Sequence, residues 1–408
     1  MKIRDLVITP LALDDPPLLN ATGVHEPLAL RCVVRLVVDG DVAGLGECGG
    51  EKWLLDNLAA VREHLIGMSV FETTSIGLLV EDLLKDAPSI NHRRATASAI
   101  EVACLDAQGK LLGLPVCDLL GGRVRDSVPY SAYLFYKWAR HPERPGLPDA
   151  WGEALDPAGI VEQARRMIGR YGFRSIKLKG GVFPPEEEIA AIRALHKAFP
   201  GYPLRIDPNC AWTPETSVYV AQELDGILEY LEDPTPGVYG MAAVARVATM
   251  PLATNMCVIN FETVEPAAER GAVDVVLSDH HYWGGLRRTR ELGAVCETLG
   301  LGLSMHSNSH LGISLAAMTH VAAATPNLTY ACDTHYPWTA ADDVLAEPLE
   351  FVDGGVAVPA GPGLGIELDE AKLAERHAVF AASGRTIRDD TGYLRRFVPS
   401  FDPQLPRW

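Results

Sequence analysis

The chain has 408 residues and a formal net charge of −17, with 48% hydrophobic and 22% charged residues. This length predicts two domains, or one large barrel with an accessory part. The excess of acidic residues argues against nucleic-acid binding, and the sequence contains no apolar run of 18 residues that could span a membrane. Eight cysteines are scattered singly without a CxxC pair, and acidic residues occupy the place of a secretory signal, so we expect a reduced cytoplasmic protein.

The first part of the chain, residues 1–125, is expected to form an α+β domain. The β-rich run 28–40 ends on Asp39-Gly40, a hairpin signal, and residues 42–51 can supply the return strand. Residues 93–113 place Ala, Leu and Val at helical spacing and end with a glycine, which predicts a helix.

Residues 126–345 alternate short β-like runs with helix-length segments, which predicts a parallel sheet. Eight such units indicate a β/α barrel of the TIM type. The alternative is a doubly wound sheet, but no GxGxxG loop follows the first strand. The expected strands lie within 128–135, 175–180, 203–209, 228–234, 252–256, 275–281, 302–308 and 329–336.

The last part, residues 346–408, contains a predicted hairpin followed by a Gly/Pro-rich loop (351–370) and a charged, aromatic tail. A free tail would carry fewer aromatic residues. We therefore expect both the hairpin and the tail to pack back on the first domain.

Polar residues end each of the last seven expected strands. Lys177 and Lys179 are two apart in one strand, so both ammonium groups point to the same face. The others are Asp207, Asn209, Glu232, Asp233, Asn255, Asp279, His306, Asp333 and His335. One Asp or Asn after a strand is usually a helix cap. A whole series at intervals of 23 to 29 residues instead predicts one polar site at the mouth of a barrel.

The residue types indicate a chemistry for this site. Asp207, Glu232 and Asn255 offer hard oxygen ligands that suit Mg²⁺, whereas no His/Cys cluster has the spacing for zinc. Mutual repulsion and burial should lower the pKa of a paired lysine, giving a base. His306 follows the next strand after Asp279, and the two could form a dyad. Two bases flanking a hard metal suggest proton abstraction next to a carboxylate.

Several motifs resemble the enolase superfamily, and within it the glucarate dehydratase group. They are "KLK", "RIDPN", "LEDP", "LATNM", "LSDHHYWGG", "SMHSNSHLGISLAAMTHVAAATP" and "CDTH". The resemblance implies a (β/α)7β barrel capped by an α+β domain built from both chain ends. It implies that Lys179 is one base with Lys177 as its electrostatic partner, that His306 is the second base paired with Asp279, and that Asn308 contacts the substrate or an oxyanion. It further implies Asp207 and Asn255 as metal ligands, and His25, Tyr133, Asn209, His335 and Arg388 as substrate contacts.

One departure concerns the second metal ligand. In the glucarate dehydratases it can come from a Glu a few residues after "EDP", but here the stretch is "EDPTPGVYGM", with Tyr239 near that place. We therefore expect Glu232 to bind the metal; a weakened site is the alternative.

The activity that the resemblance implies is a Mg²⁺-dependent acid-sugar dehydratase, converting D-glucarate to 5-dehydro-4-deoxy-D-glucarate. The partner is then a small-molecule acid sugar, and a homo-oligomer is expected because such barrels often assemble. Two alternatives stay open. One is an epimerase or racemase, or a dehydratase of another acid sugar, in the same superfamily. The other is a non-catalytic homologue.

Overall fold

The computed structural model describes residues 1–144 and 150–408. The first domain contains an antiparallel sheet in the order β1 (Ile3–Asp14), β4 (Leu28–Val38), β5 (Ala43–Gly49). The helices α1 (Lys52–Leu65), α2 (Thr73–Leu83), α3 (Ile90–Leu112) and α4 (Val116–Leu119) follow. The predicted hairpin at 28–51 is confirmed, and so is the helix at 93–113, which ends on the left-handed Gly113 (φ 70°).

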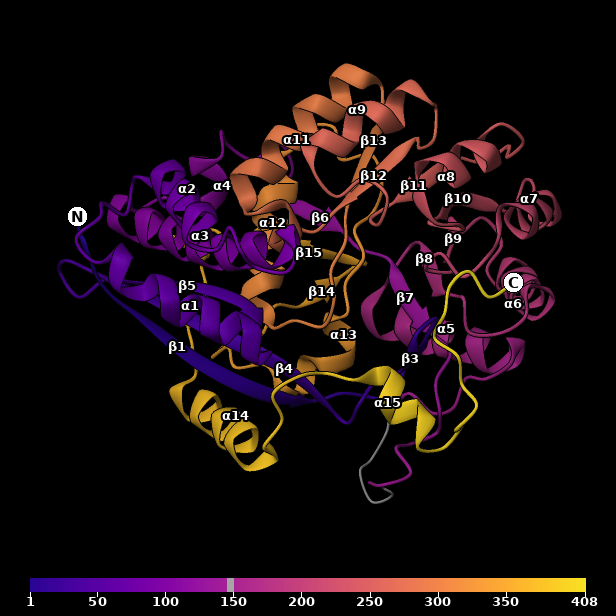
Figure 1. Ribbon diagram of the computed structural model, residues 1–408, viewed down its shortest axis with the longest axis horizontal. Helices are drawn as coiled ribbons and strands as arrows, with labels where there is room; N and C mark the ends of the chain where they lie inside the picture. Colours follow the sequence, from indigo (N-terminus) through magenta and orange to yellow (C-terminus); the bar gives the residue numbers. More distant parts are fainter. Residues whose placement is uncertain (145–149) are drawn as a thin grey trace.

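The second unit is a seven-stranded parallel sheet that curls into a TIM-type barrel, as predicted (Figure 1). Its strands, in spatial order, are β7 (Ala132–Phe135), β8 (Ile176–Lys179), β9 (Leu204–Asp207), β10 (Leu228–Glu232), β11 (Leu252–Thr254), β12 (Val275–Ser278) and β13 (Gly302–Met305). The connecting helices are α5 (Pro157–Tyr171), α6 (Pro185–Ala198), α7 (Pro214–Glu223), α8 (Gly237–Ala245), α9 (Phe261–Glu269), α10 (His280–Trp283), α11 (Leu286–Leu299) and α12 (Gly312–Ala324).

The predicted eighth strand, 329–336, does not form a regular strand. Residues 329–333 instead bridge the two edges of the sheet. On one side the Asp333 amide donates to Met305 O (3.0 Å), and on the other Ser131 N donates to Cys332 O (2.8 Å). This irregular segment therefore takes the eighth position and closes the barrel between β13 and β7.

The C-terminal part returns to both units. The hairpin β14 (Phe351–Val352) and β15 (Gly355–Ala357) pairs with β6 (Ser127–Pro129) beside the barrel, so the prediction that it packs on the first domain is wrong. The Gly/Pro-rich loop after it does pack there as predicted, since Leu364 N donates to Asp106 Oδ1 (2.7 Å) on α3. The helices α14 (Glu370–Ser383) and α15 (Asp390–Arg395) do return to the first domain, against β1 and the short strand β3 (Gly23–Val24). The remaining elements are β2 (Leu19–Asn20), α13 (Tyr336–Thr339) and a 3₁₀ turn (Ala340–Asp342).

Two buried glutamates of the first domain hold the ends of barrel helices. Glu47, on β5, accepts hydrogen bonds from Leu311 N (2.8 Å) and Ser314 N (2.9 Å) at the start of α12. Glu101, on α3, accepts from Leu286 N (2.6 Å) at the start of α11. Because the first amides of a helix have no partner within it, these side-chain oxygens satisfy them and fix the first domain on the barrel.

All eight cysteines are free, and seven of them are buried. Within residues 1–144 and 150–408, none of the helices combines the length and the apolar character needed to cross a bilayer.

Candidate active site

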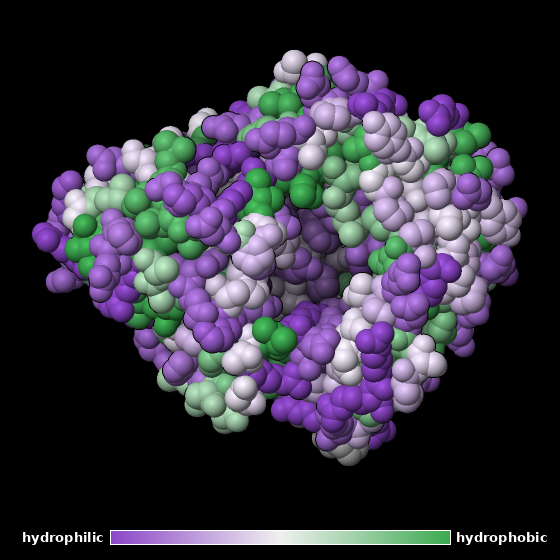
Figure 2. All heavy atoms as spheres, in the orientation of Figure 1, coloured by the Kyte–Doolittle hydropathy of each residue, from purple (hydrophilic) through white to green (hydrophobic). Residues whose placement is uncertain are grey.

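A large cavity of about 950 Å³ opens where the first domain covers the C-terminal ends of the barrel strands. Its walls come from three stretches of the chain: the first domain, the strand ends, and residues 387–391. In the space-filling view it is a deep hollow at the centre of the molecule, with hydrophilic residues in its depth (Figure 2). This is the mouth at which the sequence predicted the polar residues to meet.

The two lysines of β8 occupy different depths. Lys179 lines the cavity, and its Nζ donates to Asp207 Oδ2 (2.6 Å) and to Asn209 Oδ1. Lys177 lies fully buried, with Nζ 2.7 Å from Glu232 Oε2 and 2.8 Å from Asp333 Oδ2. Its partners therefore explain how a lysine can be buried in a barrel.

The lowered pKa expected for a lysine of this pair does not hold for Lys177. Burial alone lowers the pKa of this ammonium group, but the carboxylates of Asp333 and Glu232 outweigh burial and raise it well above its usual value. Lys177 is thus a fixed positive charge beside Lys179.

The histidine predicted as the second base has a different partner from the one expected. His306 follows β13 and lines the cavity, and its Nδ1 lies 2.8 Å from Asp333 Oδ1. Burial would raise the pKa of Asp333, but Lys177 and His306 bring it well below its usual range. The Asp333 carboxylate therefore stays ionised and holds Nδ1 of His306. Nε2 is then the ring nitrogen that can exchange a proton with a substrate.

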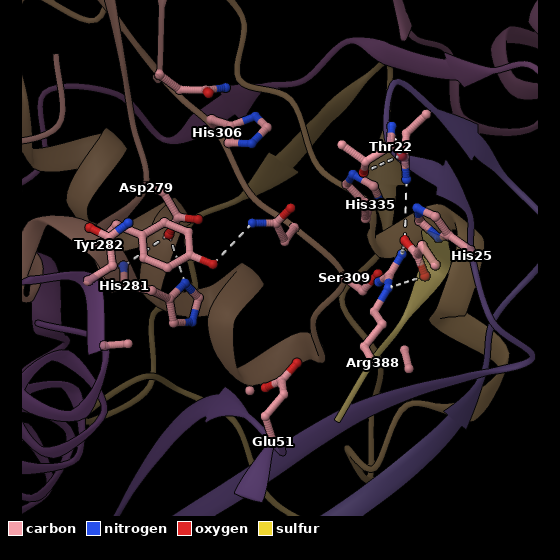
Figure 3. Close-up of a pocket in the computed structure, with 18 of the residues that line it drawn as sticks. Thr22, His25, Glu51, Asp279, His281, Tyr282, His306, Ser309, His335 and Arg388 are labelled. Atoms are coloured by element: carbon pink, nitrogen blue, oxygen red, sulfur yellow. Dashed lines mark hydrogen bonds and ion pairs between the residues drawn. The ribbon is translucent and has the colours of Figure 1, made fainter. Parts of the chain in front are cut away.

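Asp279, predicted to pair with His306, hydrogen-bonds a neighbour instead. Its Oδ1 lies 2.8 Å from His281 Nδ1, and His281 Nε2 lies 3.1 Å from Ser314 Oγ. With His280, these two residues bring ligand atoms within 4.8 Å of one another, although the sequence predicted no histidine cluster for zinc. Both ring nitrogens of His281 are already hydrogen-bonded, so the group is a polar network on one wall of the cavity (Figure 3).

The predicted substrate contacts also meet in this cavity: His25, Tyr133, Asn209, His335, Arg388 and Asn308 all line it. The rings of His25 and His335 stack with centroids 6.0 Å apart, and Arg388 Nη1 lies 3.6 Å from Asp15 Oδ2. Figure 3 shows His25, His335 and Arg388 grouped across the open space from Asp279 and Tyr282. This side of the cavity is therefore rich in imidazole rings, and its Arg388 guanidinium is also paired with Asp390 (Nη2–Oδ2 2.7 Å).

Comparison with known proteins fits this architecture. Residues 6–121 match the mandelate racemase / muconate lactonizing enzyme N-terminal domain, and residues 159–372 match the enolase C-terminal domain-like family. The chain belongs to the enolase superfamily. The prediction of this family from the motifs is confirmed.

Enolase-superfamily proteins of several organisms resemble the chain over almost all of its length. A probable glucarate dehydratase of Streptomyces coelicolor is 52% identical over 99% of the chain and 100% of that protein. An enolase of Gibberella zeae, solved with magnesium, formate and sulfate, is 55% identical with a TM-score of 0.97, over 100% of this chain and 97% of that one. An enolase of Mycobacterium smegmatis solved with tartrate is 58% identical with a TM-score of 0.96, over 100% and 98%.

The predicted metal ligands of this enolase-superfamily chain lie on three adjacent strands. Asp207 and Glu232 end β9 and β10, and Asn255 follows β11, with its Nδ2 2.9 Å from Glu232 Oε1. Burial and the nearby Asp207 charge raise the pKa of Glu232 well above its usual value. Two buried carboxylates with the side-chain amide of a half-buried asparagine beside them are residue types that fit a divalent cation such as Mg²⁺, which would offset the repulsion between the two acids.

Tyr239 takes no part in this donor set. Its side chain is 77% exposed on α8 and lies against the Arg270 guanidinium, 5.1 Å from the ring centroid. The position that raised doubt about the second ligand thus points away from the barrel, and Glu232 is the acid that faces the other donors.

Asp233 and Asp333, which the sequence placed at strand ends without a catalytic or metal-binding role, form a layer that supports the site. Asp233 has a left-handed backbone (φ 36°) and accepts from Thr254 Oγ1 (2.5 Å) and Asn255 N (2.8 Å). Burial and Asp207 raise its pKa to about 6. Both acids were visible at strand ends, but only the structure shows that Asp233 orients Asn255 and that Asp333 orients His306.

Other lining residues come from the first domain: Asn20, Thr22, Arg31, Glu51 and Trp53. They follow no strand of the barrel, so the β/α period gave no signal for them. Only the closure of the first domain over the barrel brings them to the site.

Proposed function

We propose that the protein is a Mg²⁺-dependent acid-sugar dehydratase acting on D-glucarate or a closely related diacid. The observation that carries this proposal is that Lys179 and His306 line the same cavity from strands three positions apart around the closed barrel. The 52% identity to a probable glucarate dehydratase supports the substrate class. The similar structures solved with magnesium or with tartrate, a hydroxylated dicarboxylate, agree with it.

The lysine side of the site removes a proton. In its unprotonated form, Lys179 Nζ takes the hydrogen on the carbon next to the substrate carboxylate, and the C–H electron pair moves toward that carboxylate. Lys177 stays charged beneath it, because three carboxylates surround its ammonium group, and it favours the negative charge that develops. Asp207, Glu232 and Asn255 would hold Mg²⁺, which supplies Lewis-acid stabilisation of that charge when bound.

The histidine side completes the elimination. His306, held through Nδ1 by Asp333, donates the proton on Nε2 to the β-hydroxyl. The carbon–oxygen bond breaks, water leaves, and the resulting enol becomes a 2-keto acid. General acid and general base thus act on neighbouring carbons.

The chain carries −17 overall, and the two cations of the cavity wall named here are already paired, Lys179 with Asp207 and Arg388 with Asp390. A diacid would therefore be held by individual donors of the wall and by a bound divalent cation, because net charge does not attract it.

A product assay tests the proposal. Purified protein with Mg²⁺ should generate a 2-keto product from D-glucarate, and Lys179→Met and His306→Gln should each abolish it. Tyr239→Phe, a change on the exposed side of α8, serves as the matched control and should keep full activity. Lack of product from every acid sugar in a broad library would reject the proposal.

An epimerase is the second candidate, because bases from two sides of one cavity can exchange a proton without loss of water. Incorporation of solvent deuterium next to the carboxylate, with no keto product, would favour it.

A further inference from the structure

The cavity wall includes a small hairpin of the first domain. β2 and β3 pair through only two residues each, Leu19–Asn20 with Gly23–Val24. The hairpin presents Asn20 and Thr22 to the cavity, and His25 follows it directly. A two-stranded ribbon this short has little stability of its own, so its position must be set from outside.

One side of the hairpin rests on the start of α15. Thr391 Oγ1 donates to Thr22 O (2.6 Å), and Asn20 Nδ2 donates to Asp390 Oδ2 (3.3 Å). The approach is so close that a Cβ on Gly23 would lie 2.4 Å from Asp390 O. This contact fixes the hairpin to the segment that also carries Arg388.

The other side of the hairpin is held by Arg407. Arg407 Nη2 donates to Ala21 O (2.7 Å) in the hairpin turn and to Asp402 O (2.8 Å), and Nη1 lies 3.5 Å from Gly181 O. The guanidinium also lies against two aromatic rings, 4.8 Å from the Phe401 centroid and 5.1 Å from that of Trp408.

The segment that carries Arg407, residues 401–408, is itself bound to the barrel. Arg407 N donates to Ala211 O (2.7 Å), and Thr213 N donates to Trp408 O (2.5 Å) at the start of α7. Phe401, Leu405 and Trp408 pack partly buried against the main core. Figure 1 shows this segment running from α15 across to the α6–α7 side of the barrel.

We propose that Arg407 is a positioning residue that sets the β2–β3 hairpin at a fixed distance from the strand ends that carry Lys179 and Asn209. Gly181 follows Lys179 by two residues, and Ala211 follows Asn209 by two. The Arg407 side chain thus links the hairpin turn to the loop after Lys179. The Arg407 backbone is hydrogen-bonded to the loop after Asn209. The inference rests on the proposed function for its kinetic consequence but not for its structural one.

The contacts of the Arg407 side chain require a guanidinium group. Nη2 donates to two backbone carbonyls and Nη1 to a third, and the planar guanidinium lies against two aromatic rings. A lysine keeps the charge but cannot reproduce this fork. Arg407→Lys should therefore resemble Arg407→Ala more than the unchanged protein.

Hydrogen exchange and kinetics test the proposal on the full chain. The variants are Arg407→Ala, Arg407→Lys and the control Arg396→Ala, whose guanidinium pairs with Glu143 and stacks on Tyr393. In Arg407→Ala, amides 18–25 should exchange at least about tenfold faster while the barrel strands keep their protection. KM for the acid sugar should rise about tenfold with a smaller change in kcat, as expected when a binding group is misplaced.

Hydrogen exchange distinguishes a failure of the proposed role of Arg407 from a failure of the proposed function. Faster exchange confined to 18–25 supports the role of Arg407 even if no acid sugar is turned over, in which case only the proposed function fails. Unchanged exchange at 18–25, or acceleration spread equally over the barrel, overturns it. So does a KM rise of equal size in Arg396→Ala.

Discussion

Replacing Glu47 with alanine should cost about 3–5 kcal/mol of unfolding free energy. The side chain is buried, and its Oε1 lies 2.8 Å from both Arg31 Nε and Leu311 N. Its Oε2 accepts from Ser314 N at 2.9 Å. Alanine would remove three bonds to an ionised carboxylate and leave the Arg31 guanidinium, only 10% exposed, without its counter-charge. Uncompensated buried charge is the dominant cost.

Urea titration followed by circular dichroism measures this loss. Asp5→Ala is the control, because the Asp5–Arg62 pair is exposed on both sides and should contribute at most about 1 kcal/mol. Glu47→Gln, which keeps the volume and one acceptor, should fall between the two. A loss of less than about 1 kcal/mol in Glu47→Ala, or one equal to that of the control, would refute the argument that this carboxylate clamps the first domain to α12.

Glu101→Gln should flatten the pH dependence of stability. Burial raises the pKa of Glu101 from 4.5 to about 7, so its stabilising protonated form is complete below pH 4.5 and is lost as pH rises through 7. Urea titrations at about pH 5 and pH 8 should show the variant losing about 3 kcal/mol less than the unchanged protein, at about 1.4 kcal/mol per pH unit. Asp333→Asn should lower kcat on D-glucarate by on the order of 100-fold and Asp279→Asn by clearly less, since only Asp333 contacts His306; equal losses would contradict this pairing. Chelation of divalent cations should abolish product formation reversibly, and Glu232→Gln should raise the Mg²⁺ concentration for half-maximal activity at least about tenfold. An unchanged Mg²⁺ requirement would exclude Glu232 as a ligand.

The fold was largely predictable because its signals are local. The hairpin 28–51, the helix ending at Gly113 and the β/α repeat all follow from short-range patterns. The irregular form of the eighth barrel position was not predictable from the sequence. Residues 329–333 have strand-like composition, but they take their place through contacts with both edges of the sheet. The hairpin 351–357 was misplaced for a similar reason: nothing in its own sequence specifies β6 as its neighbour.

The site shows the same division. The β/α period and the positions of the strand ends correctly predicted that Lys179, Asn255 and His306 lie in one cavity. The partner of His306 could not be read in this way, because β13 is flanked by β12, which precedes Asp279, and by the segment that ends at Asp333. Both acids are neighbours in the barrel, and only the orientation of the imidazole selects between them. The raised pKa of Lys177 likewise depends on acids contributed by three other positions of the barrel.

The hairpin of residues 19–24 has a consequence for how the protein matures. Its two turn carbonyls are held by Thr391 and Arg407, more than 360 positions later in the sequence. During synthesis the barrel can be nearly finished while this part of the active-site wall still lacks its supports. Catalytic competence should therefore appear late, after most of the helical signal has recovered, when a refolding chain has brought its earliest and latest segments together.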